Sequence, residues 1–288
     1  MKYRNAFRVN SSRSLDLRSV DPAGTGGISN KESAGQKLER DIGRLRDAQS
    51  VFTAAGRYAL LVIFQGMDTA GKDGAVSHVM SGMNPQGVSV TSFRQPSPEE
   101  LRHDYLWRCV KAMPERGRIG IFNRSYYEDV IVTRVHRELL GSALPKARAE
   151  QTKFWQHRYT DIKDYEHYLV RNGTHVVKFF LHISKEEQRK RLLARLDDRE
   201  KQWKFSVGDV QQRAFWNDYS TAYETMLVET STSWAPWFIV PSDHKWFTRV
   251  AVADILVSTM KSLRLHYPRL PKELRSNLHS LRAELAKP

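Results

Sequence analysis

The sequence predicts an α/β fold, a three-layer sandwich in which helices cover both faces of a five-stranded parallel sheet. Strand-length apolar segments alternate along the chain with segments of helical period, which is the rhythm of repeated βα units. The run 59–65 is apolar almost throughout, which is typical of a strand buried on both faces. A glycine-rich loop follows this run directly and leads into a helical pattern.

The elements follow one another in a regular order. Residues 1–32 are polar and form an N-terminal extension, 33–270 form the core with a lid at about 184–212, and 271–288 form a tail. We expect strands at 59–65, 88–93, 119–122, 175–183 and 237–241, and helices at 33–54, 72–83, 97–114, 146–169, from 184, after 209 and at 250–265, the last of them amphipathic.

Helix starts rest on capping residues. Ser97-Pro98-Glu99-Glu100 combines an N-cap serine, a proline at the first helical position and a glutamate three residues after the cap. A second capping box begins at Ser184, and Asp209 is the expected cap of the following helix. Aromatic residues at helical spacing are core in most proteins, and we expect one such buried face from Trp155, Tyr159, Ile162 and Tyr168.

The composition is that of a folded protein outside the membrane. Of the 288 residues, 40% are apolar and 27% charged, which excludes a disordered chain. The run 58–64 is far shorter than the roughly 20 residues that cross a bilayer, and the basic N-terminus lacks the apolar core of a signal peptide. Cys109 is the single cysteine, so a disulfide framework is excluded. We expect a cytoplasmic protein without a membrane partner.

The high net positive charge predicts a polyanionic partner. Lys and Arg number 46 against 32 Asp and Glu, giving a formal net charge of +14. Nucleic acid, an anionic membrane, nucleotides and polyphosphate all meet this demand, and charge alone does not choose among them. Because the basic residues are not confined to a tail, we expect a basic surface or channel.

The glycine-rich loop has the pattern G-x-x-x-x-G-K. Glycines at its two ends permit a tight turn and a close approach to an anion, the N–H groups at a helix start attract phosphate, and Lys72 supplies a mobile cation. Strand, loop, lysine and helix are in register, which is the context that this motif requires. The predicted phosphate-binding residues are Gly66, Thr69, Ala70, Gly71, Lys72, Asp73 and Gly74.

Two acids distinguish this loop. Asp73 stands where Ser or Thr usually binds Mg²⁺. Asp68 also lies in the loop, and an acid among phosphates is unfavourable unless a cation neutralises it. We infer that Asp68 helps to hold Mg²⁺; the alternative is that it caps the loop through the backbone.

A second polar segment follows the third strand. The residues Phe122-Asn123-Arg124-Ser125-Tyr126-Tyr127-Glu128-Asp129 emerge at the carboxyl edge of the sheet, where open α/β sheets bind ligands. Arg124 suits bidentate phosphate binding, and Glu128 and Asp129 offer oxygen ligands for Mg²⁺ or contacts to a nucleotide. The alternative is a structural ion-pair network.

A basic stretch between 185 and 204 follows the fourth strand. Arg191 and Arg195 are four residues apart and share a helix face, and Lys201 and Lys204 follow in a less regular segment. P-loop kinases carry a lid in this position, which brings cations to the transferred group and excludes water. The alternative is a solvated charged face.

Three motifs together resemble the polyphosphate kinase 2 family: GMDTAGKDG, NRSYYEDV, and R-L-L-A-R followed by K-Q-W-K, spread over residues 30–270. The resemblance implies a P-loop nucleotide-kinase-like core with a lid, phosphoryl transfer between inorganic polyphosphate and nucleotides, a need for Mg²⁺ with Mn²⁺ as a substitute, and a homo-oligomer. The forms G-K-D-G and F-N-R-S-x-Y-E-D resemble the class III subgroup, which accepts AMP and ADP and yields ADP and ATP; guanine nucleotides belong to the expected partners.

The resemblance also implies a role for each site residue and shows where this sequence differs from relatives. Lys72 and Arg124 are expected to stabilise the transferred group, and Asp68, Asn123 and Glu128 to hold the metal. Many relatives carry a metal-binding Asp where this chain has Asn123, so Glu128 or Asp129 takes part of that role. The lid segment 198–204 lacks the proline of relatives. Arg191, Arg195, Lys201 and Lys204 are expected to guide the polyphosphate.

Two other functions remain as alternatives. An ATP-dependent nucleotide kinase shares the core but needs no polyphosphate. A basic nucleic-acid-binding protein would use the same charge, although the sequence has no helix-turn-helix or zinc-finger pattern. The ten His residues are scattered without an H-E-x-x-H motif or a cysteine pair, which argues against a zinc enzyme.

Overall fold

A five-stranded parallel sheet forms the centre of the molecule. The computed structural model describes residues 2–10, 15–142 and 153–287, without the side chains of Ser142 and Lys204. The strand order is β2-β3-β1-β4-β5, so the chain crosses from one side of β1 to the other between β3 and β4, and the ligand crevice of such a sheet lies beside β1. The strands are β1 (Ala59–Gln65), β2 (Val88–Ser92), β3 (Ile119–Asn123), β4 (Thr174–His182) and β5 (Trp237–Pro241).

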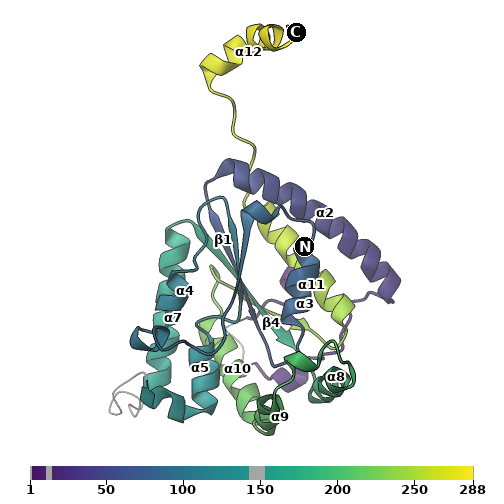
Figure 1. Ribbon diagram of the computed structural model, residues 1–288, viewed down its shortest axis with the longest axis vertical. Helices are drawn as coiled ribbons and strands as arrows, with labels where there is room; N and C mark the ends of the chain where they lie inside the picture. Colours follow the sequence, from purple (N-terminus) through teal and green to yellow (C-terminus); the bar gives the residue numbers. More distant parts are fainter. Residues whose placement is uncertain (1, 11–14, 143–152, 288) are drawn as a thin grey trace.

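Helices pack on both faces of this sheet (Figure 1). On one face α11 contacts α1, α2 and α3, and on the other α10 contacts α5 and α7. The helices of these layers are α1 (Lys2–Ala6), α2 (Lys31–Ala55), α3 (Lys72–Val79), α5 (Glu128–Val135), α7 (Phe154–Arg171), α10 (Trp216–Thr230) and α11 (Lys245–Ser262). Shorter pieces connect them: α4 (Trp107–Val110), η1 (Leu17–Ser19), η2 (Pro85–Gly87), η3 (Glu100–Arg102) and η4 (Arg137–Ser142).

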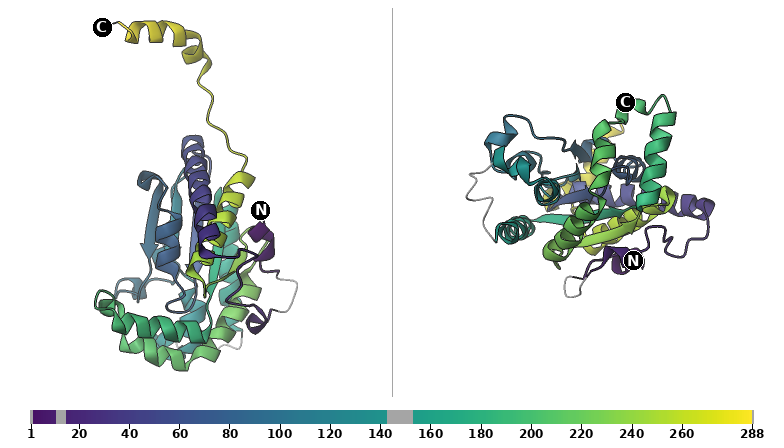
Figure 2. Two further views of the ribbon diagram at one scale, coloured as in Figure 1. Left: turned by 90° about the vertical axis from the view of Figure 1, so that its right-hand side faces the viewer. Right: turned by 90° about the horizontal axis from the view of Figure 1, so that it is seen from below.

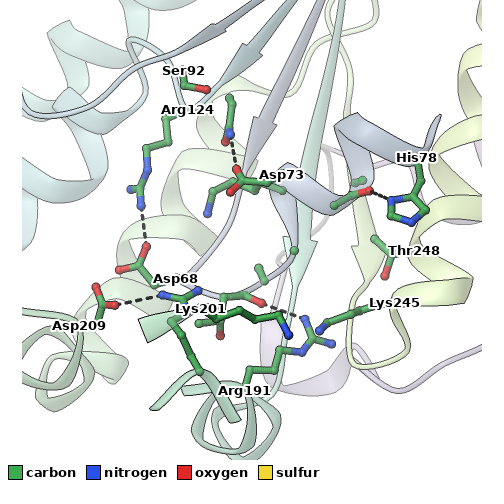
Figure 3. A pocket seen from close by; sticks show the side chains of 18 of the residues that line it. Asp68, Asp73, His78, Ser92, Arg124, Arg191, Lys201, Asp209, Lys245 and Thr248 are labelled. Atoms are coloured by element: carbon green, nitrogen blue, oxygen red, sulfur yellow. Dashed lines mark hydrogen bonds and ion pairs between the residues drawn. The ribbon is translucent and has the colours of Figure 1, made fainter. Parts of the chain in front are cut away.

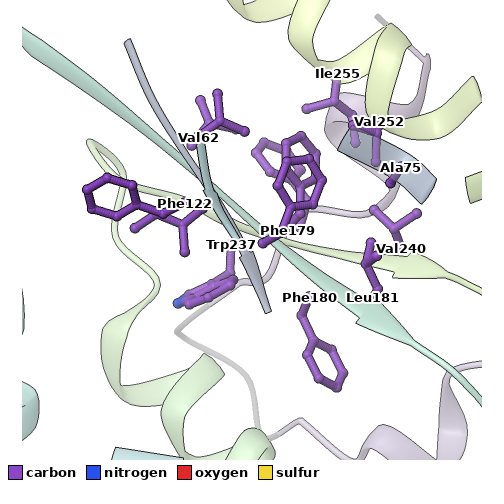
Figure 4. Packing of buried hydrophobic residues seen from close by; sticks show 14 of the residues in the cluster. Val62, Ala75, Phe122, Phe179, Phe180, Leu181, Trp237, Val240, Val252 and Ile255 are labelled. Carbon is purple, nitrogen blue, oxygen red and sulfur yellow. The ribbon is translucent and has the colours of Figure 1, made fainter. Parts of the chain in front are cut away.

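The core lies on both sides of the central strands. Every residue of β1 is buried, since β3 and β4 flank it and helices cover both of its faces. Val252 and Ile255 of α11 pack on one side of the sheet, whereas Phe180 of β4 points to the other side and contacts Tyr223 of α10 (Figure 4). This burial on two faces explains the continuous apolar run in the sequence.

The two ends of the sheet carry different appendages. At the carboxyl ends of the strands, α8 (Lys185–Asp197), η5 (Gln202–Lys204) and α9 (Val207–Ala214) form the lid, as Figure 2 shows from a second side. At the opposite end, α12 (Lys272–Leu285) stands away from the body (Figure 1). The N-terminal extension packs on the body through buried Tyr3 and Leu17, and Arg8 bridges antiparallel to Phe238 of β5. No helix in the part of the chain that the structure describes is long and apolar enough to cross a membrane.

The predicted strands and their parallel arrangement are confirmed, and one predicted helix is wrong. The capping box at Ser97 forms as expected, because Ser97 Oγ accepts the Glu100 N–H at 3.2 Å and a Glu100 carboxylate oxygen accepts the Ser97 N–H at 2.7 Å. Only η3 follows it, and α4 is a separate short helix. A cap stabilises the first turn alone, and this segment buries too little apolar surface to extend it.

Three smaller expectations are also corrected. Ser206 caps α9 through the Gly208 N–H, whereas Asp209 lies inside its first turn. Tyr168 is 57% exposed, so the buried face of α7 contains Tyr159 and Ile162 but not Tyr168. Helix α11 is buried on nearly every side instead of amphipathic, because α1, α2, α3 and β5 enclose it. The expected helical residues 146–152 lie outside the described part of the chain.

Candidate active site

The phosphate loop joins β1 to α3 in a geometry that only glycine permits at its start. Gly66 has φ +155°, and a Cβ atom there would lie 2.7 Å from the Leu181 carbonyl oxygen. Gly71 has φ +101° and begins α3 without a side-chain cap. The first N–H groups of a helix lack partners within the helix, so the loop presents them to whatever anion enters.

Lys72 is folded back onto its own loop. Its Nζ donates to the carbonyl oxygens of Gly66 at 2.7 Å and Met67 at 3.1 Å, and the residue is buried. Burial, reinforced by the nearby Arg124 charge, lowers the pKa of Lys72 to about 8. A phosphate in the loop would offset both effects and offer the ammonium a stronger partner than the carbonyls.

Arg124 joins the phosphate loop to the second polar segment. It follows β3 directly, and its guanidinium donates to Asp68 Oδ1 at 2.5 Å (Figure 3). The same guanidinium donates to Glu128 Oε2 at 3.0 Å. Glu128 raises the pKa of Arg124 above its ordinary value. Burial raises the pKa of Asp68, but Arg124 and Lys72 outweigh it, so the pKa of Asp68 is lowered. Asp68 is therefore charged at neutral pH, and one guanidinium joins it to Glu128.

Of the other predicted residues, Asp73 and Asn123 line the cleft described below, whereas Asp129 does not. Asn123 donates its side-chain N–H to Asp73 Oδ1 at 2.6 Å, so these two residues form a separate pair at the start of α3. Asp129 lines neither of the two cavities described below. Burial raises the pKa of Asp129 to about 6, opposed by Arg158 and Arg108.

A cleft of about 1020 Å³ opens above the phosphate loop (Figure 3). Basic side chains outnumber acidic ones along its wall. They come from four places in the chain: the phosphate loop, the ends of β2 and β3, the lid, and the start of α11. Its charged lining residues are Asp68, Lys72, Asp73, Arg94, Arg124, Arg191, Arg195, Lys201, Asp209, Lys245 and Arg249.

The limb of the cleft along α11 was not anticipated from the sequence. Lys245 and Arg249 are one helical turn apart, and Thr248 lies between them on the cleft wall. Burial lowers the pKa of Lys245, and the neighbouring charge of Arg191 lowers it further; burial also lowers the pKa of Arg249. The signal was present in the sequence, because these residues follow the fifth strand and so lie at the carboxyl edge of the sheet.

The lid arginines differ in their surroundings. Arg191 is buried and donates to three backbone carbonyls, Thr69 O at 2.9 Å, Ser242 O at 2.6 Å and Asp243 O at 2.9 Å. Arg195 is partly exposed and pairs with Asp209 at 3.3 Å. Lys201 is exposed and hydrogen-bonded to Asp198. The side chain of Lys204, also expected here, lies outside the described part of the structure.

A second, small cavity of about 50 Å³ lies behind the Asp68–Arg124 pair. Gln188, Gln212, Tyr219 and Tyr223 contribute to its wall from the lid and α10. Its volume suits water, since a water molecule occupies about 30 Å³ of liquid. Asp68, Arg124 and Asp209 line both cavities, so these side chains separate the small cavity from the large cleft.

The site fits a magnesium ion that is bound mainly through substrate. Among the described residues no group of three His, Cys, Asp or Glu side chains lies close enough to hold a metal ion. Mg²⁺ in phosphoryl-transfer enzymes is bound through one or two carboxylates plus substrate phosphates, so a protein cage is not required. Asp68 provides one carboxylate, and Glu128 Oε1 is buried without a hydrogen-bond partner, as an oxygen reserved for a cation would be.

Comparison with known proteins settles the family. The model of the family described as polyphosphate kinase 2 matches residues 28–267. The chain belongs to this family. A Rhodopseudomonas palustris relative named ADP-polyphosphate phosphotransferase is 47% identical over 286 residues, covering 98% of each chain. A Meiothermus ruber relative named AMP/ADP-polyphosphate phosphotransferase is 42% identical over 263 residues, covering 91% of this chain and 94% of its own.

Solved structures of polyphosphate kinase 2 proteins agree with this placement. The crystal structure of polyphosphate kinase 2 from Arthrobacter aurescens TC1 superposes with a TM-score of 0.89 at 40% identity, covering 99% of this chain and 97% of its own. The match extends over the lid and the N-terminal extension as well as the sheet. The P-loop-kinase-like architecture expected from the sequence is thereby confirmed.

Proposed function

We propose that this polyphosphate kinase 2 protein transfers phosphoryl groups from inorganic polyphosphate to nucleotides, converting ADP to ATP and AMP to ADP. The relatives from R. palustris and M. ruber carry names of this activity over nearly their whole length. One observation of the chain itself carries the proposal furthest: the phosphate loop opens into a cleft of about 1020 Å³ whose basic lining continues from the loop through the lid to the start of α11. A polymer with a charge on every unit matches such a wall.

The residues of the cleft divide the work. Lys72 and the N–H groups at the start of α3 bind the phosphate that enters the loop. Arg124 exchanges Asp68 and Glu128 for oxygens of the transferred group and stabilises the charge there. Arg195, Lys201, Lys245 and Arg249 hold the polyphosphate, while the lid excludes water. Little covalent chemistry is needed, because positioning and charge neutralisation account for most of the catalysis.

Mg²⁺ is the proposed cofactor, with Mn²⁺ as a substitute. Asp68 and Glu128 would hold it. Asn123, the other predicted metal ligand, is hydrogen-bonded to Asp73 and would hold that side chain instead. The ion supplies charge neutralisation between donor and acceptor phosphates. We further propose that the protein works in the cytoplasm as a homo-oligomer and accepts guanine nucleotides.

The test is ATP formation by the purified full chain from ADP, long-chain polyphosphate and Mg²⁺, with AMP in parallel and each component omitted in turn. ATP that forms only when polyphosphate is present supports the proposal, because a contaminating adenylate kinase makes ATP from ADP alone. Asp68→Asn, purified identically, controls for other contaminants. AMP turnover by this chain shows which of the two relatives it resembles in substrate range. Activity on ADP alone would match the name of the R. palustris relative, and activity on both nucleotides would match that of the M. ruber relative. Nucleoside or nucleotide phosphorylation from ATP without polyphosphate would replace the proposal with an ATP-dependent kinase.

A further inference from the structure

A fully buried ion pair lies under the second polar segment of the site. Lys178, in the middle of β4, donates to Glu166 Oε2 of α7 at 2.5 Å, and neither side chain is exposed to solvent. Lys178 also donates to the Thr230 carbonyl oxygen at 2.8 Å. Burial lowers the pKa of Lys178, and Glu166 opposes this shift. Every donor on Lys178 and both oxygens of Glu166 have partners.

The ion pair is hydrogen-bonded to the hydroxyls of two consecutive tyrosines. The hydroxyls of Tyr126 and Tyr127 both donate to Glu166 Oε1, each at 2.8 Å. The Tyr127 hydroxyl also accepts from Lys178 at 2.9 Å. Both rings are fully buried, and Tyr127 packs edge-on against Trp237 of β5 with ring centroids 4.8 Å apart. The buried charges thus fix two adjacent positions of one short loop.

That loop joins two charged residues of the site, since Arg124 lines the cleft and Glu128 lines the small cavity behind it. Tyr126 and Tyr127 lie between Arg124 and Glu128 in the sequence. Arg124 has φ +65°, a left-handed conformation that costs free energy for a residue with a side chain. Its N–H donates to the Phe64 carbonyl oxygen at 3.0 Å, and Gln65 donates to Ser125 Oγ at 3.3 Å. Such a conformation persists only where the surrounding structure holds it.

Stability does not explain a pair of this kind. Removing two charges from water is costly, and apolar residues of similar volume commonly replace buried ion pairs without loss of stability. The attested use of buried ionic groups is to specify one arrangement, and the arrangement specified here is that of the Tyr126–Tyr127 backbone.

We propose that Glu166 and Lys178 are positioning residues for phosphoryl transfer, holding Tyr126 and Tyr127 so that Arg124 and Glu128 face Asp68 and the phosphate loop. The proposal rests on the proposed function, since the reaction is the one that Arg124 serves. Neither residue reaches the cleft, so they act through the loop. A purely structural role would instead support the fold and leave the chemistry of folded molecules unchanged.

The first test uses Tyr126→Phe/Tyr127→Phe, which removes both hydroxyls and keeps the rings. We expect kcat for ATP formation to fall 10- to 100-fold while KM for ADP changes less than threefold, because Arg124 loses its position against the transferred group whereas the two tyrosines do not line the cleft. A second variant, Tyr126→Phe/Tyr127→Phe/Glu166→Leu/Lys178→Met, replaces the whole network with apolar groups. It should unfold at the same or a higher urea concentration and still show the lowered kcat. Wild-type kcat in this stable variant would overturn the proposal.

Coupling to Arg124 separates positioning from structure. In an Arg124→Lys background, the Tyr126→Phe/Tyr127→Phe change should lower kcat less than twofold further, because the residue that it positions is already altered. If the double change lowered kcat by the same factor in both backgrounds, the proposal would be overturned. The matched control is Lys37→Met/Asp41→Asn, which disrupts a partly buried ion pair of 2.6 Å on α2 outside the cleft and should leave kcat unchanged.

A readout without turnover keeps the inference distinct from the proposed function. The affinity for inorganic tripolyphosphate, measured by calorimetry, should fall several-fold in Tyr126→Phe/Tyr127→Phe. In the Arg124→Lys background the same double change should leave this affinity nearly unaltered. An inactive wild-type chain would refute the proposed function alone, and the binding cycle would still decide the inference: additive changes in affinity would refute it.

Discussion

Asp68 has two partners to serve in the catalytic cycle. In the structure it accepts a hydrogen bond from Arg124, and in the proposed function Arg124 releases it when a phosphate binds. The carboxylate then faces the phosphates, where it needs a cation beside it. The sequence left open a metal ligand or a backbone cap of the loop for Asp68, and an ion-pair network only for Arg124 and the acids after it. The structure adds Asp68 to that network, and the proposed metal ligand is the same side chain with substrate bound.

Replacing Asp68 with Asn should lower kcat on the order of 100-fold, the usual loss for one electrostatic contact in a transition state, and leave the chain folded, since Glu128 still pairs with Arg124. Steady-state ATP formation and urea unfolding measure the two effects. Asp73→Asn is the matched control within the same loop, because Asp73 pairs with Asn123; a larger loss of kcat in Asp73→Asn than in Asp68→Asn would move the metal to the Asp73 side.

The lowered pKa of Lys72 predicts that kcat/KM falls at alkaline pH. Its pKa of about 8 means that the ammonium is present below pH 8 and is lost as the pH rises above it. The value of kcat/KM for polyphosphate, which reports the free enzyme, should therefore fall about tenfold per pH unit above 8. Bound phosphate raises the pKa, so the limb in kcat should lie at higher pH.

The variant Lys72→Arg assigns this limb. Its guanidinium stays charged over the whole range, so the limb near pH 8 should disappear even though the absolute rate falls. Lys245→Arg is the comparison, because burial lowers the pKa of Lys245 too. A limb that persists in Lys72→Arg and disappears in Lys245→Arg would assign it to α11 instead.

At the scale of elements, two residues of the lid helix α8 hold it to the phosphate loop, and Arg191 makes most of the hydrogen bonds. Arg191 binds the Thr69 carbonyl of the loop together with two carbonyls after β5, and Gln188 adds a hydrogen bond to the Asp68 carbonyl at 3.2 Å. Arg195, one turn further, lies on the cleft side and pairs with Asp209. The sequence assigned both arginines to polyphosphate because they share a helix face, and spacing alone does not reveal their depth.

Arg191→Met and Arg195→Met should consequently differ. Arg191→Met strands three carbonyls and should lower the free energy of unfolding by about 3 kcal/mol. Arg195→Met should change it little and raise KM for polyphosphate several-fold instead. Urea unfolding with KM measured for polyphosphate and ADP compares them; equal stability of the two variants would refute the clamp.

Element prediction succeeded where the pattern came from burial and failed where it came from a local signal. The strand at 59–65 and helix α2 were predicted within two residues at each end, because their apolar periods reflect the core they enter. The capping box at Ser97 is real but predicts only a first turn. Lys178 in the strand HVVKFFLH was an overlooked signal: a charge inside a buried strand requires a buried partner.

At the scale of the whole molecule, the sequence predicted the class of sheet but not its order or the meeting of distant segments. The order β2-β3-β1-β4-β5 brings α11 against α3 and so beside the phosphate loop, although the two segments lie far apart in the sequence. Thr248 and Arg249 reach the cleft for this reason. Long-range packing of this kind leaves no local pattern, so the charge of +14 indicated a basic channel without locating it.

The basic channel predicts how salt acts on the two substrates. In the proposed function polyphosphate contacts cations of the lid and α11, and Lys201, Lys245 and Arg249 line the cleft there. Each such contact releases counterions, and added salt opposes this release. Raising the salt from roughly 50 to 200 mM should therefore increase KM for long-chain polyphosphate on the order of tenfold, whereas KM for ADP, which carries few charges, should change far less.

The variant Lys245→Gln/Arg249→Gln locates the effect in the fold. Removing two of the cations should reduce the slope of log KM for polyphosphate against log salt by between one and two, with the salt response of KM for ADP unaltered. The matched control, Lys163→Gln/Arg171→Gln on α7, changes the net charge equally at residues that do not line the cleft. If the control reduced the slope as much, the overall charge of the molecule, and not the limb of the cleft along α11, would attract the polyphosphate.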